Sequence, residues 1–234
     1  MRYLKYLSKD TNPYRNLAIE EYLFRFAEKD TLILYLWQND NTIVIGRNQD
    51  VDAECRREEF LRQDGRIARR KSGGGAVYHD LGNLNFSLIG RKEDVDEGFY
   101  KQFILKMLNQ LHLEGRFSGK NDIEINGKKI SGNAAYDNGQ ALCQHGTILV
   151  CSDISKMTYY LTPQESKLER HAVKSVRSRV MNLCELLPDI SVNIVIEAIE
   201  SAFHTEQLTF EPDMELDSLS AKYESKDWIF GGKQ

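Results

Sequence analysis

Apolar and polar residues along the N-terminal third follow patterns that predict both helices and strands. Apolar positions recur at roughly helical spacing over Asn16–Ala27, which indicates a helix. Thr31–Trp37 is too apolar and too rich in β-prone residues for a surface helix, so it predicts a buried strand. A turn at Asp40–Asn41 then returns the chain as a second strand over Thr42–Ile45. Charged residues with spaced apolar positions predict a surface helix over Asp52–Arg62.

The middle of the chain continues with short strands, one helix and a hairpin. A strand is expected over Ile67–Lys71, and the alternation in Leu84–Ile89 predicts a half-buried strand. Gly98–Leu113 carries its apolar residues on one side, as an amphipathic helix does. The turn pair Asn126–Gly127 lies between two strand-like runs, so Asp122–Ala135 predicts a β-hairpin.

The last part of the chain is predicted to be mainly helical. A further turn at Asp137–Gly139 leads to a strand over Leu142–Val150, and helices are expected at Ile154–Tyr160, Val173–Asn182 and Val192–Phe203. Strands and helices mix without a regular βαβ alternation, and hairpins recur. We therefore predict an α+β fold with largely antiparallel mixed sheets flanked by helices.

Composition and charge exclude several classes of protein. Lys+Arg 31 against Asp+Glu 35 gives a net charge of 31 − 35 = −4. Proteins that bind nucleic acid or an anionic membrane usually carry a basic surface, so this charge does not favour either partner. No apolar run approaches the roughly eighteen residues of a membrane span. The N-terminus lacks the apolar core of a secretory signal, so a cytoplasmic location is expected.

The four cysteines are Cys55, Cys143, Cys151 and Cys184. They form no C-x-x-C pair and no zinc-finger spacing with histidine. We expect reduced thiols rather than a disulfide framework.

The most distinctive stretch is RRKSGGGAVYHD, residues 69–80. Three adjacent glycines cost backbone entropy on folding, so they are typical of places where the backbone approaches a ligand or takes positive φ. Backbone N–H groups in such a loop can bind phosphate oxygens, and the three basic residues before it add charge. A flexible turn beside a solvated basic strand is the alternative, and the flanking residues favour a binding loop. The pattern is not a Walker loop, because no Gly-Lys-Ser/Thr follows.

A second candidate lies on the hairpin, with Asn121 and Asp122 on one arm and Lys128 and Lys129 on the other. A lysine on a stiff strand holds its ammonium at a fixed point. There it can stabilise the negative charge that develops when a carboxylate attacks a phosphate. Both lysines could instead be surface charges. Because side chains alternate across a strand, at most one of the two reaches the site.

The third candidate is Gln144-His145-Gly146-Thr147. A lone histidine is more often a packed or surface residue than a catalytic one. Cys143 could act as a thiol nucleophile with His145 as its base. We expect that dyad to be geometrically poor, because neighbours on a strand point to opposite faces.

With these motifs in their order, the chain resembles the lipoate–protein ligases, relatives of the octanoyltransferases and biotin ligases. The resemblance runs nearly end to end. It rests on NLAIEE from residue 16, WQNDNTIVIGRNQ from 37, RRKSGGGAVYHDLGN from 69, GKKISGNA from 127 and VKSVRSRVMNL from 173.

The resemblance implies a mixed-sheet catalytic domain and a two-step reaction. Lipoate and ATP, with magnesium, give lipoyl-AMP, and a lysine of a carrier's lipoyl domain then takes the acyl group. The carriers are E2 subunits of 2-oxoacid dehydrogenases or the glycine-cleavage H protein. Lys129 is the implied catalytic residue, Asp122 helps to hold magnesium, and Trp37 and Val77 offer an apolar wall. The implied ATP and lipoyl-AMP site consists of Arg70, Ser72, Gly73, Gly74, Gly75, Ala76, Val77, Tyr78, His79, Asn83, Asn121 and Lys129.

One departure from the family pattern concerns length. Bacterial ligases of this family usually continue into a small C-terminal accessory domain, whereas residues 1–234 are expected to hold the catalytic domain alone. The chain is therefore truncated, or it works with a separate accessory subunit, or it does not activate lipoate itself.

Two rival functions remain open. An octanoyl or lipoyl transferase would use a cysteine thioester without ATP, and Cys143 is its nearest candidate. A binding subunit would need a partner for adenylation. Biotin ligation is less favoured, because the loop reads SGGGAV rather than the GRGR type. The choice between lipoate and octanoate, the carrier and the oligomeric state are left open.

Overall fold

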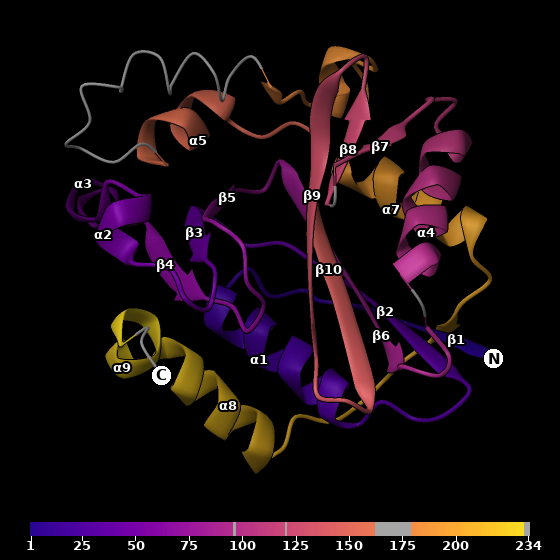
Figure 1. The fold of residues 1–234 in the computed structure, drawn as a ribbon, viewed down its shortest axis with the longest axis horizontal. Coiled ribbons are helices and arrows are strands. Elements are labelled where there is room, and N and C mark those ends of the chain that lie inside the picture. The colour runs from indigo at the N-terminus through magenta and orange to yellow at the C-terminus, as the bar shows by residue number, and fades with distance from the viewer. Residues whose placement is uncertain (96, 120, 162–178, 232–234) are drawn as a thin grey trace.

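The computed structural model describes residues 1–95, 97–119, 121–161 and 179–231, which form two sheets and surrounding helices (Figure 1). The strands are β1 Arg2–Leu7, β2 Thr31–Trp37, β3 Thr42–Ile45, β4 Arg66–Arg69, β5 Val77–His79, β6 Asn83–Arg91, β7 Arg116–Ser118, β8 Asp122–Ile125, β9 Lys128–Asp137, β10 Ala141–Leu149 and β11 Glu206–Gln207. The helices are α1 Pro13–Arg25, α2 Val51–Glu54, α3 Arg57–Arg62, α4 Glu97–Gln110, α5 Ile154–Tyr160, the 3₁₀ turn η1 Leu183–Glu185, α7 Val192–Ala202, α8 Met214–Glu224 and α9 Lys226–Phe230.

The larger sheet has the strand order β11-β1-β2-β6-β10-β9-β8-β7, and the smaller sheet has the order β4-β3-β5. In the larger sheet β1 runs parallel to β2 and β11, and the other pairs are antiparallel. In the smaller sheet β3 is parallel to β4 and antiparallel to β5. The prediction of an α+β fold with largely antiparallel mixed sheets is confirmed.

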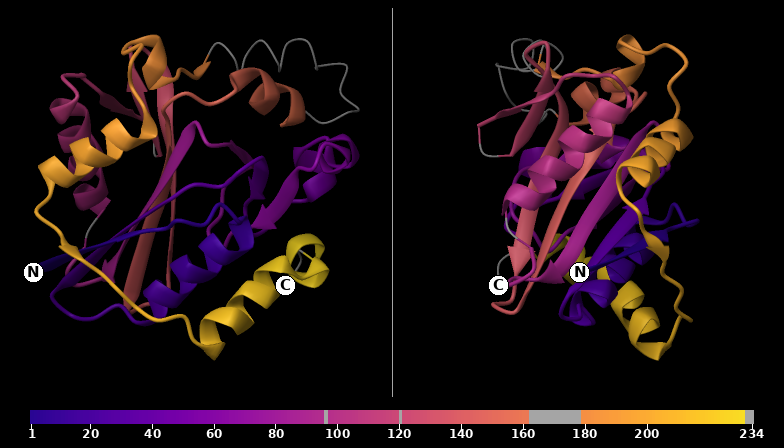
Figure 2. Two further views of the ribbon diagram at one scale, coloured as in Figure 1. Left: turned by 180° about the vertical axis from the view of Figure 1, so that it is seen from behind. Right: turned by 90° about the vertical axis from the view of Figure 1, so that its right-hand side faces the viewer.

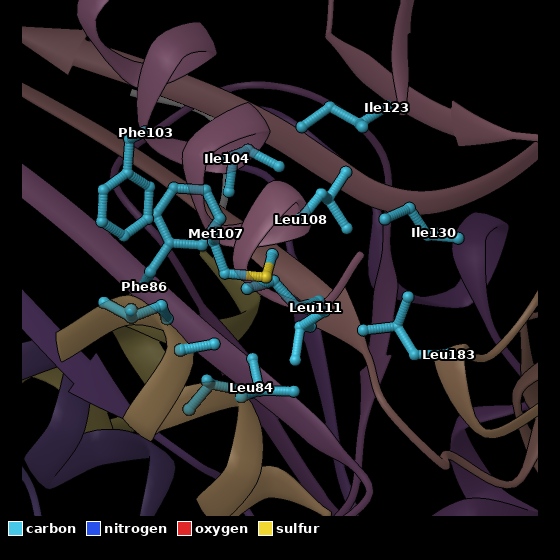
Figure 3. Close-up of a cluster of buried hydrophobic side chains, with 14 of the residues drawn as sticks. Leu84, Phe86, Phe103, Ile104, Met107, Leu108, Leu111, Ile123, Ile130 and Leu183 are labelled. Carbon is cyan, nitrogen blue, oxygen red and sulfur yellow. The ribbon is translucent and has the colours of Figure 1, made fainter. Parts of the chain in front are cut away.

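One face of the larger sheet packs against α4 and α7 and forms the main apolar core. Figure 3 shows Leu84 and Phe86 of β6 against Phe103 and Met107 of α4 and against Leu111 just after that helix, and all five are buried. Burying one such side chain contributes roughly 1.5–3 kcal/mol. The apolar packing on this face holds the sheet in place. The polar side chains described next lie on the opposite face.

The opposite face packs against α1 and carries polar side chains at alternate positions. Asn85 and Ser87 of β6 and His145 of β10 point to this side and are all buried. Polar side chains inside a buried strand need hydrogen-bond partners. Their presence here indicates a hydrogen-bond network or a binding site rather than apolar packing alone.

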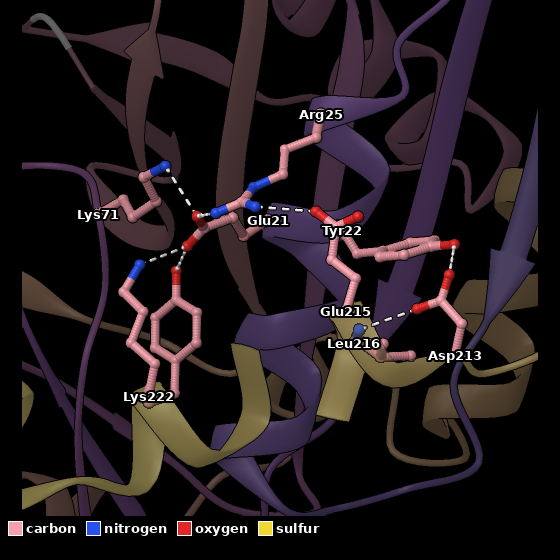
Figure 4. A network of polar contacts seen from close by, with 9 residues as sticks. Glu21, Tyr22, Arg25, Lys71, Asp213, Glu215, Leu216 and Lys222 are labelled. Carbon is pink, nitrogen blue, oxygen red and sulfur yellow. Dashed lines mark hydrogen bonds and ion pairs between the residues drawn. The ribbon is translucent and has the colours of Figure 1, made fainter. Parts of the chain in front are cut away.

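The C-terminal helix α8 lies along α1, as both views in Figure 2 show, and it meets α1 around one buried carboxylate (Figure 4). Glu21 of α1 accepts from Tyr223 at 2.8 Å and Lys222 at 2.9 Å on α8, and from Arg25 at 2.6 Å. Lys71 lies 3.4 Å away. Burial alone would raise the pKa of Glu21, but the hydrogen bonds from Lys222 and Arg25 and the charge of Lys71 lower it to about 2.

Three local predictions need correction. The turn at Asp40–Asn41 is present, but β2 and β3 do not pair, because they belong to different sheets. Asp52–Arg62 is not one helix: Cys55 is extended, with φ −153°, and separates α2 from α3 while its side chain enters the core. Leu84–Ile89 is fully buried rather than half-buried, because helices cover both faces of the sheet.

The predicted hairpin is confirmed, and its second strand changes partners. Asn126 and Gly127 have φ values of 53° and 76°, as a type I′ turn requires. β9 pairs with β8 up to Gly132 and with β10 from Asn133 onward. The strands therefore diverge at this point, where the Gly132 N–H reaches only the Thr147 side chain, at 3.3 Å.

The expectation that all cysteines are reduced is wrong for one pair. Cys151, just after β10, and Cys184 in η1 form a disulfide with their Cα atoms 5.5 Å apart. They lie 33 residues apart in sequence, and Asn182 brings them together by pairing with both the N–H and the carbonyl of Ser152. Sequence spacing carries no sign of this approach. Cys55 and Cys143 are free and buried.

The helices expected at Ile154–Tyr160 and near Val192–Phe203 are confirmed as α5 and α7, whereas the one expected at Val173–Asn182 falls mostly outside the described residues. Among the described residues, no helix combines the length and the apolar character that crossing a membrane requires.

Candidate active site

A cavity of about 350 Å³ is lined by residues of both sheets. Leu17, Trp37 and Val44 give it apolar walls, while Asp122 and Lys129 stand at its more exposed part. Small-molecule sites typically have about 300–1,000 Å³ and mostly apolar walls with a few placed polar groups. The cavity has the size and lining of such a site.

The glycine stretch forms the loop between β4 and β5 and covers one side of the cavity. Gly74 has φ 91°, a region that side chains disfavour. The loop lies so close to Gly46 that a Cβ there would stand 1.9 Å from the Gly74 carbonyl oxygen. Within the described part of the chain, the N–H groups of Gly73, Gly74 and Gly75 have no hydrogen-bond partner. These donors are available to an anion.

The three basic residues before the glycines diverge, so the expectation that all three add charge for a phosphate is wrong. Arg69 donates to the backbone carbonyls of Gly46, Arg47, Gln49, Trp228 and Ile229. It ties α9 to the loop after β3. Lys71 turns to Glu21 on α1. Only Arg70 lines the cavity.

Arg70 is buried and shapes the glycine loop from inside. Its guanidinium donates to Ser72 Oγ at 3.0 Å and to the carbonyls of Val44 at 3.0 Å, Gly73 at 2.7 Å and Gly75 at 2.8 Å. Burial lowers the pKa of Arg70 to about 10, so it stays charged at neutral pH. Three of these hydrogen bonds therefore hold the loop, and the one to Val44 joins it to β3.

A buried chain of hydrogen bonds links the glycine loop to α1 and the larger sheet. Ser72 Oγ lies 2.6 Å from His145 Nε2, and His145 Nδ1 lies 2.8 Å from Glu20 Oε1. Ser87 donates to the same carboxylate at 2.5 Å and accepts from Trp37 Nε1 at 3.1 Å. One connected network thus positions the loop, the histidine and the aromatic wall together.

The ionisation of Glu20 determines which groups donate in this hydrogen-bond network. Burial raises the pKa of the Glu20 carboxyl, but the charge and hydrogen bond of His145 and the hydroxyl of Ser87 outweigh burial and lower it overall. The ionised carboxylate only accepts, so His145 carries its proton on Nδ1. Ser72 Oγ and His145 Nε2 share a second hydrogen bond, whose direction is set by the protonation state of the ring.

His79 is held neutral with one nitrogen toward the cavity. Asn16 donates to Asn39 Oδ1 at 3.1 Å, which fixes the Asn39 amide so that its Nδ2 donates to His79 Nδ1 at 3.1 Å. The proton of His79 is then on Nε2. Burial, and after it the charges of Arg70 and His145, lower the pKa of His79 to about 3.

Lys129 lies on β9 beside the point where that strand leaves β10. Its ammonium is 2.8 Å from Asp122 Oδ1 on the neighbouring strand, and both side chains are partly exposed. Lys129 lines the cavity and Lys128 does not, as strand alternation predicts.

Three buried polar atoms at the cavity wall have no partner among the described residues: His79 Nε2, Asn85 Nδ2 and Asn133 Oδ1. Buried polar atoms are almost always paired, so unpartnered ones around a cavity point to a ligand that supplies the missing partner. The two donors, His79 Nε2 and Asn85 Nδ2, suit a polar or charged end on an otherwise apolar ligand, whereas the acceptor, Asn133 Oδ1, belongs to a residue that also lines a neighbouring cavity.

Most residues singled out from the sequence converge on this cavity. Its lining includes Trp37, Arg70, Gly74, Gly75, Ala76, Val77, His79, Asn121, Asp122 and Lys129. Ser72 and Gly73 are not part of the lining and bond to Arg70 instead. Tyr78 points into the core beside Phe60, and Asn83 donates to Asn85 at 2.9 Å.

Sequence reasoning missed the polar partners behind the cavity. Glu20 was quoted only within a motif, and Asn85 and Ser87 were treated as ordinary strand residues. Glu54 was also missed, although its carboxylate accepts from the Ala76 N–H at 2.8 Å and supports the loop. The available signal was polar residues at positions expected to be buried, such as the alternating Asn and Ser in LNFSLI.

The geometric argument against a Cys143–His145 dyad is wrong, because residues two apart on a strand share a face. The ligand atoms of Cys143, His145 and Glu20 all lie within 4.8 Å of one another. Burial, and after it the charge of Glu20, raise the pKa of the Cys143 thiol well above its usual value. The thiol is therefore protonated and poorly suited to nucleophilic attack.

Comparison with known proteins agrees with this geometry. The family model of the lipoyl protein ligase A/B catalytic domain matches residues 12–204. Lipoate-protein ligase A of Psychrobacter cryohalolentis is 39% identical over 247 residues, covering 99% of this chain and 72% of the relative. That of Blochmanniella floridana is 40% identical, covering 84% of this chain and 59% of the relative.

Two solved structures share the fold over almost the whole chain. A bi-partite lipoate protein ligase from Thermoplasma acidophilum, described with its E2 lipoyl domain, has a TM-score of 0.84 and 28% identity and covers 100% of this chain and 97% of its own. A lipoate-protein ligase A bound with ATP has a TM-score of 0.81 and 26% identity and covers 99% of each chain.

Fold, cavity and matches together define the catalytic domain of a protein ligase. The chain belongs to the lipoyl protein ligase A/B family. The sequence-based prediction of a lipoate–protein ligase is confirmed by these matches.

Proposed function

We propose that this chain activates lipoate with ATP to lipoyl-AMP and transfers the lipoyl group to a lysine of a lipoyl domain. The observation that carries the proposal is the arrangement of the cavity: apolar walls inside, and Lys129 with Asp122 at its more exposed part. An acyl chain fits the apolar part, and its carboxylate then lies near a fixed cation.

Lys129 is the proposed catalytic residue. When the carboxylate attacks the α-phosphate of ATP, negative charge accumulates on the acyl and phosphoryl oxygens. A cation held on a strand at that point stabilises the transition state more than the ground state. Asp122 keeps the ammonium in place through their 2.8 Å contact.

The glycine loop is the proposed site for the nucleotide phosphates. The N–H groups of Gly73, Gly74 and Gly75 offer donors, and the buried charge of Arg70 adds a positive potential behind them. Asp122 is the proposed residue for Mg²⁺, because a carboxylate oxygen beside phosphate groups is the setting that this ion prefers. Lys129 contacts Asp122 Oδ1, which leaves Oδ2 without a hydrogen-bond partner among the described residues.

The proposed carriers are E2 lipoyl domains or the glycine-cleavage H protein, and the proposed location is the cytoplasm. The relative from Thermoplasma acidophilum is bi-partite and is described with an E2 lipoyl domain. That relative supports a lipoyl domain as the acceptor here. It also makes a separate accessory subunit a reasonable partner for adenylation.

The experiment that tests the proposal is lipoate-dependent release of pyrophosphate by the purified chain with ATP and Mg²⁺. We expect release, followed by lipoylation when an apo lipoyl domain is added. If pyrophosphate appears only with an accessory subunit, activation needs the partner. If transfer occurs from octanoyl thioester without ATP, the transferase alternative replaces the ligase.

Replacing Arg70 with alanine is expected to weaken ATP binding about tenfold or more. The substitution removes a charged group that makes three hydrogen bonds to the loop and one to β3, and hydrogen bonds to charged groups contribute roughly 1.5–3 kcal/mol. Isothermal titration calorimetry measures the change. Arg70→Lys is the matched control: it keeps the charge but cannot span the loop carbonyls, so we expect little rescue. An unchanged ATP dissociation constant in Arg70→Ala contradicts the assignment.

A further inference from the structure

A second cavity of about 450 Å³ lies next to the first. Asn121 and Asn133 line both cavities, so the two meet beside Lys129 and Asp122. The second cavity is completed by Gln144 of β10 and by Lys101 of α4. Gln144 alternates with the neighbouring His145 and therefore faces the α4 side of the sheet.

Two amide side chains that line this second cavity each have a buried oxygen atom without a hydrogen-bond partner among the described residues. Gln144 is 4% exposed, and its Oε1 has no hydrogen-bond partner among the described residues. Asn133 donates through Nδ2 to the Asn121 carbonyl at 2.9 Å and to Ser131 Oγ at 3.3 Å. Its Oδ1 is therefore an acceptor, and it too is buried without a partner. The group missing at Asn133 Oδ1 is an N–H donor, and the Gln144 amide can turn its oxygen to the same group.

We propose that the second cavity receives the aminoalkyl side chain of the acceptor lysine, with Asn133 and Gln144 as positioning residues for its amine. This inference rests on the proposed ligase function. Two substrates must converge on one carbonyl carbon, and the acyl group occupies the first cavity while the amine attacks. The second cavity gives the amine its own route to the acyl carbonyl carbon, because it adjoins the first cavity beside Lys129 and Asp122.

The charges around the second cavity favour the reactive form of an amine. Lys101 comes from α4, while Lys129 and Asp122 on the hairpin pair with each other. No carboxylate is among the described residues that line this cavity. Nearby cations disfavour an ammonium, so an entering lysine is more readily neutral. Only the neutral amine has a lone pair for attack.

The transfer step balances with groups already in the proposed reaction. The amine nitrogen forms a bond to the acyl carbon, and the bond from that carbon to the phosphoryl oxygen breaks. Its electron pair leaves with AMP, and the extra proton of the amine passes to solvent. The two amide oxygens hold N–H groups and aim the lone pair at the carbonyl.

The test bypasses adenylation by supplying synthetic lipoyl-AMP to the full chain with n-butylamine as the amine. In Gln144→Met, which keeps the side-chain length, the second-order rate constant for butylamine should fall about fivefold, the loss expected for one hydrogen bond. Hydroxylamine is small enough to react without the subsite, so its rate should stay within about twofold. Gln207→Met, at an exposed position on β11, is the matched control.

Two outcomes overturn the inference: an unchanged butylamine rate in Gln144→Met, or an equal fall for butylamine and hydroxylamine. Pyrophosphate release from lipoate and ATP is measured in parallel on the unmodified chain. Its absence counts against the proposed function, and the transfer assay still decides the amine subsite.

Lys101→Met tests the same subsite without changing the sheet. At saturating butylamine, loss of this cation should move the rising limb of the pH–rate profile to higher pH, because the bound ammonium form becomes easier to keep. A purely structural role for Lys101 would leave the limb in place. An unchanged profile removes the electrostatic part of the inference.

Discussion

Replacing Lys129 with methionine is expected to lower the rate of lipoyl-AMP formation by about 10²–10³-fold, the cost of removing one fixed group that stabilises developing charge. Methionine is one atom shorter than lysine and keeps an unbranched apolar stem, so most of the cavity wall is preserved while the cation is lost. Lipoate-dependent pyrophosphate release measures the effect, and circular dichroism checks that the fold is intact.

The matched control is Lys128→Met. Lys128 is the neighbouring residue on β9 and is absent from the cavity lining, so the same change of charge occurs one residue away from the site. We expect near-normal turnover in this variant. Equal losses in the two variants would mean that general charge near the hairpin, not a fixed ammonium at residue 129, supports the reaction.

Replacing Glu21 with glutamine is expected to lower the free energy of unfolding at pH 7 by about 3 kcal/mol. The pKa of Glu21 falls from 4.5 to about 2 on folding, and each unit corresponds to roughly 1.4 kcal/mol. The substitution leaves Lys222, Arg25 and Lys71 around a neutral group. Urea denaturation measures the difference.

The sign of the pH dependence follows from the lowered pKa. A carboxyl that is more acidic in the folded state contributes its stability above pH 4.5, and that contribution is lost as the pH falls toward 2. The gap between the unmodified chain and Glu21→Gln should therefore close over that range. Glu58→Gln, at an exposed position on α3, should stay within about 0.5 kcal/mol of the unmodified chain. A gap that persists at pH 2 contradicts the account.

The sequence was most informative where a local pattern determines local structure. The Asn126–Gly127 turn, the apolar run of β2 and the periodicity of α4 each depend on short-range rules, and all three elements are present. Alternation along β9 also separated Lys128 from Lys129 correctly. The glycine loop was recognised because its composition is costly unless the backbone has a special task.

Long-range relations were not predictable in the same way. Arg69 donates to a carbonyl of α9 that lies 160 positions away in the sequence. No pattern within the glycine loop itself predicts this contact. The network around His145 depends on Glu20, 125 residues away. Alternation along β6 predicts a half-buried strand, whereas the strand is buried on both faces, because alternation reflects polarity and not which surfaces neighbouring elements cover.

The bond between Cys151 and Cys184 changes what a cut in the chain can do. Residues 152–183 form a covalently closed loop, so a single proteolytic nick within it leaves one molecule rather than two. The fragments stay together on a denaturing gel and part only after a reductant is added. A nick on either side of the loop releases a free piece at once. Paired reduced and unreduced gel lanes therefore map cleavage positions relative to the two cysteines without sequencing the fragments.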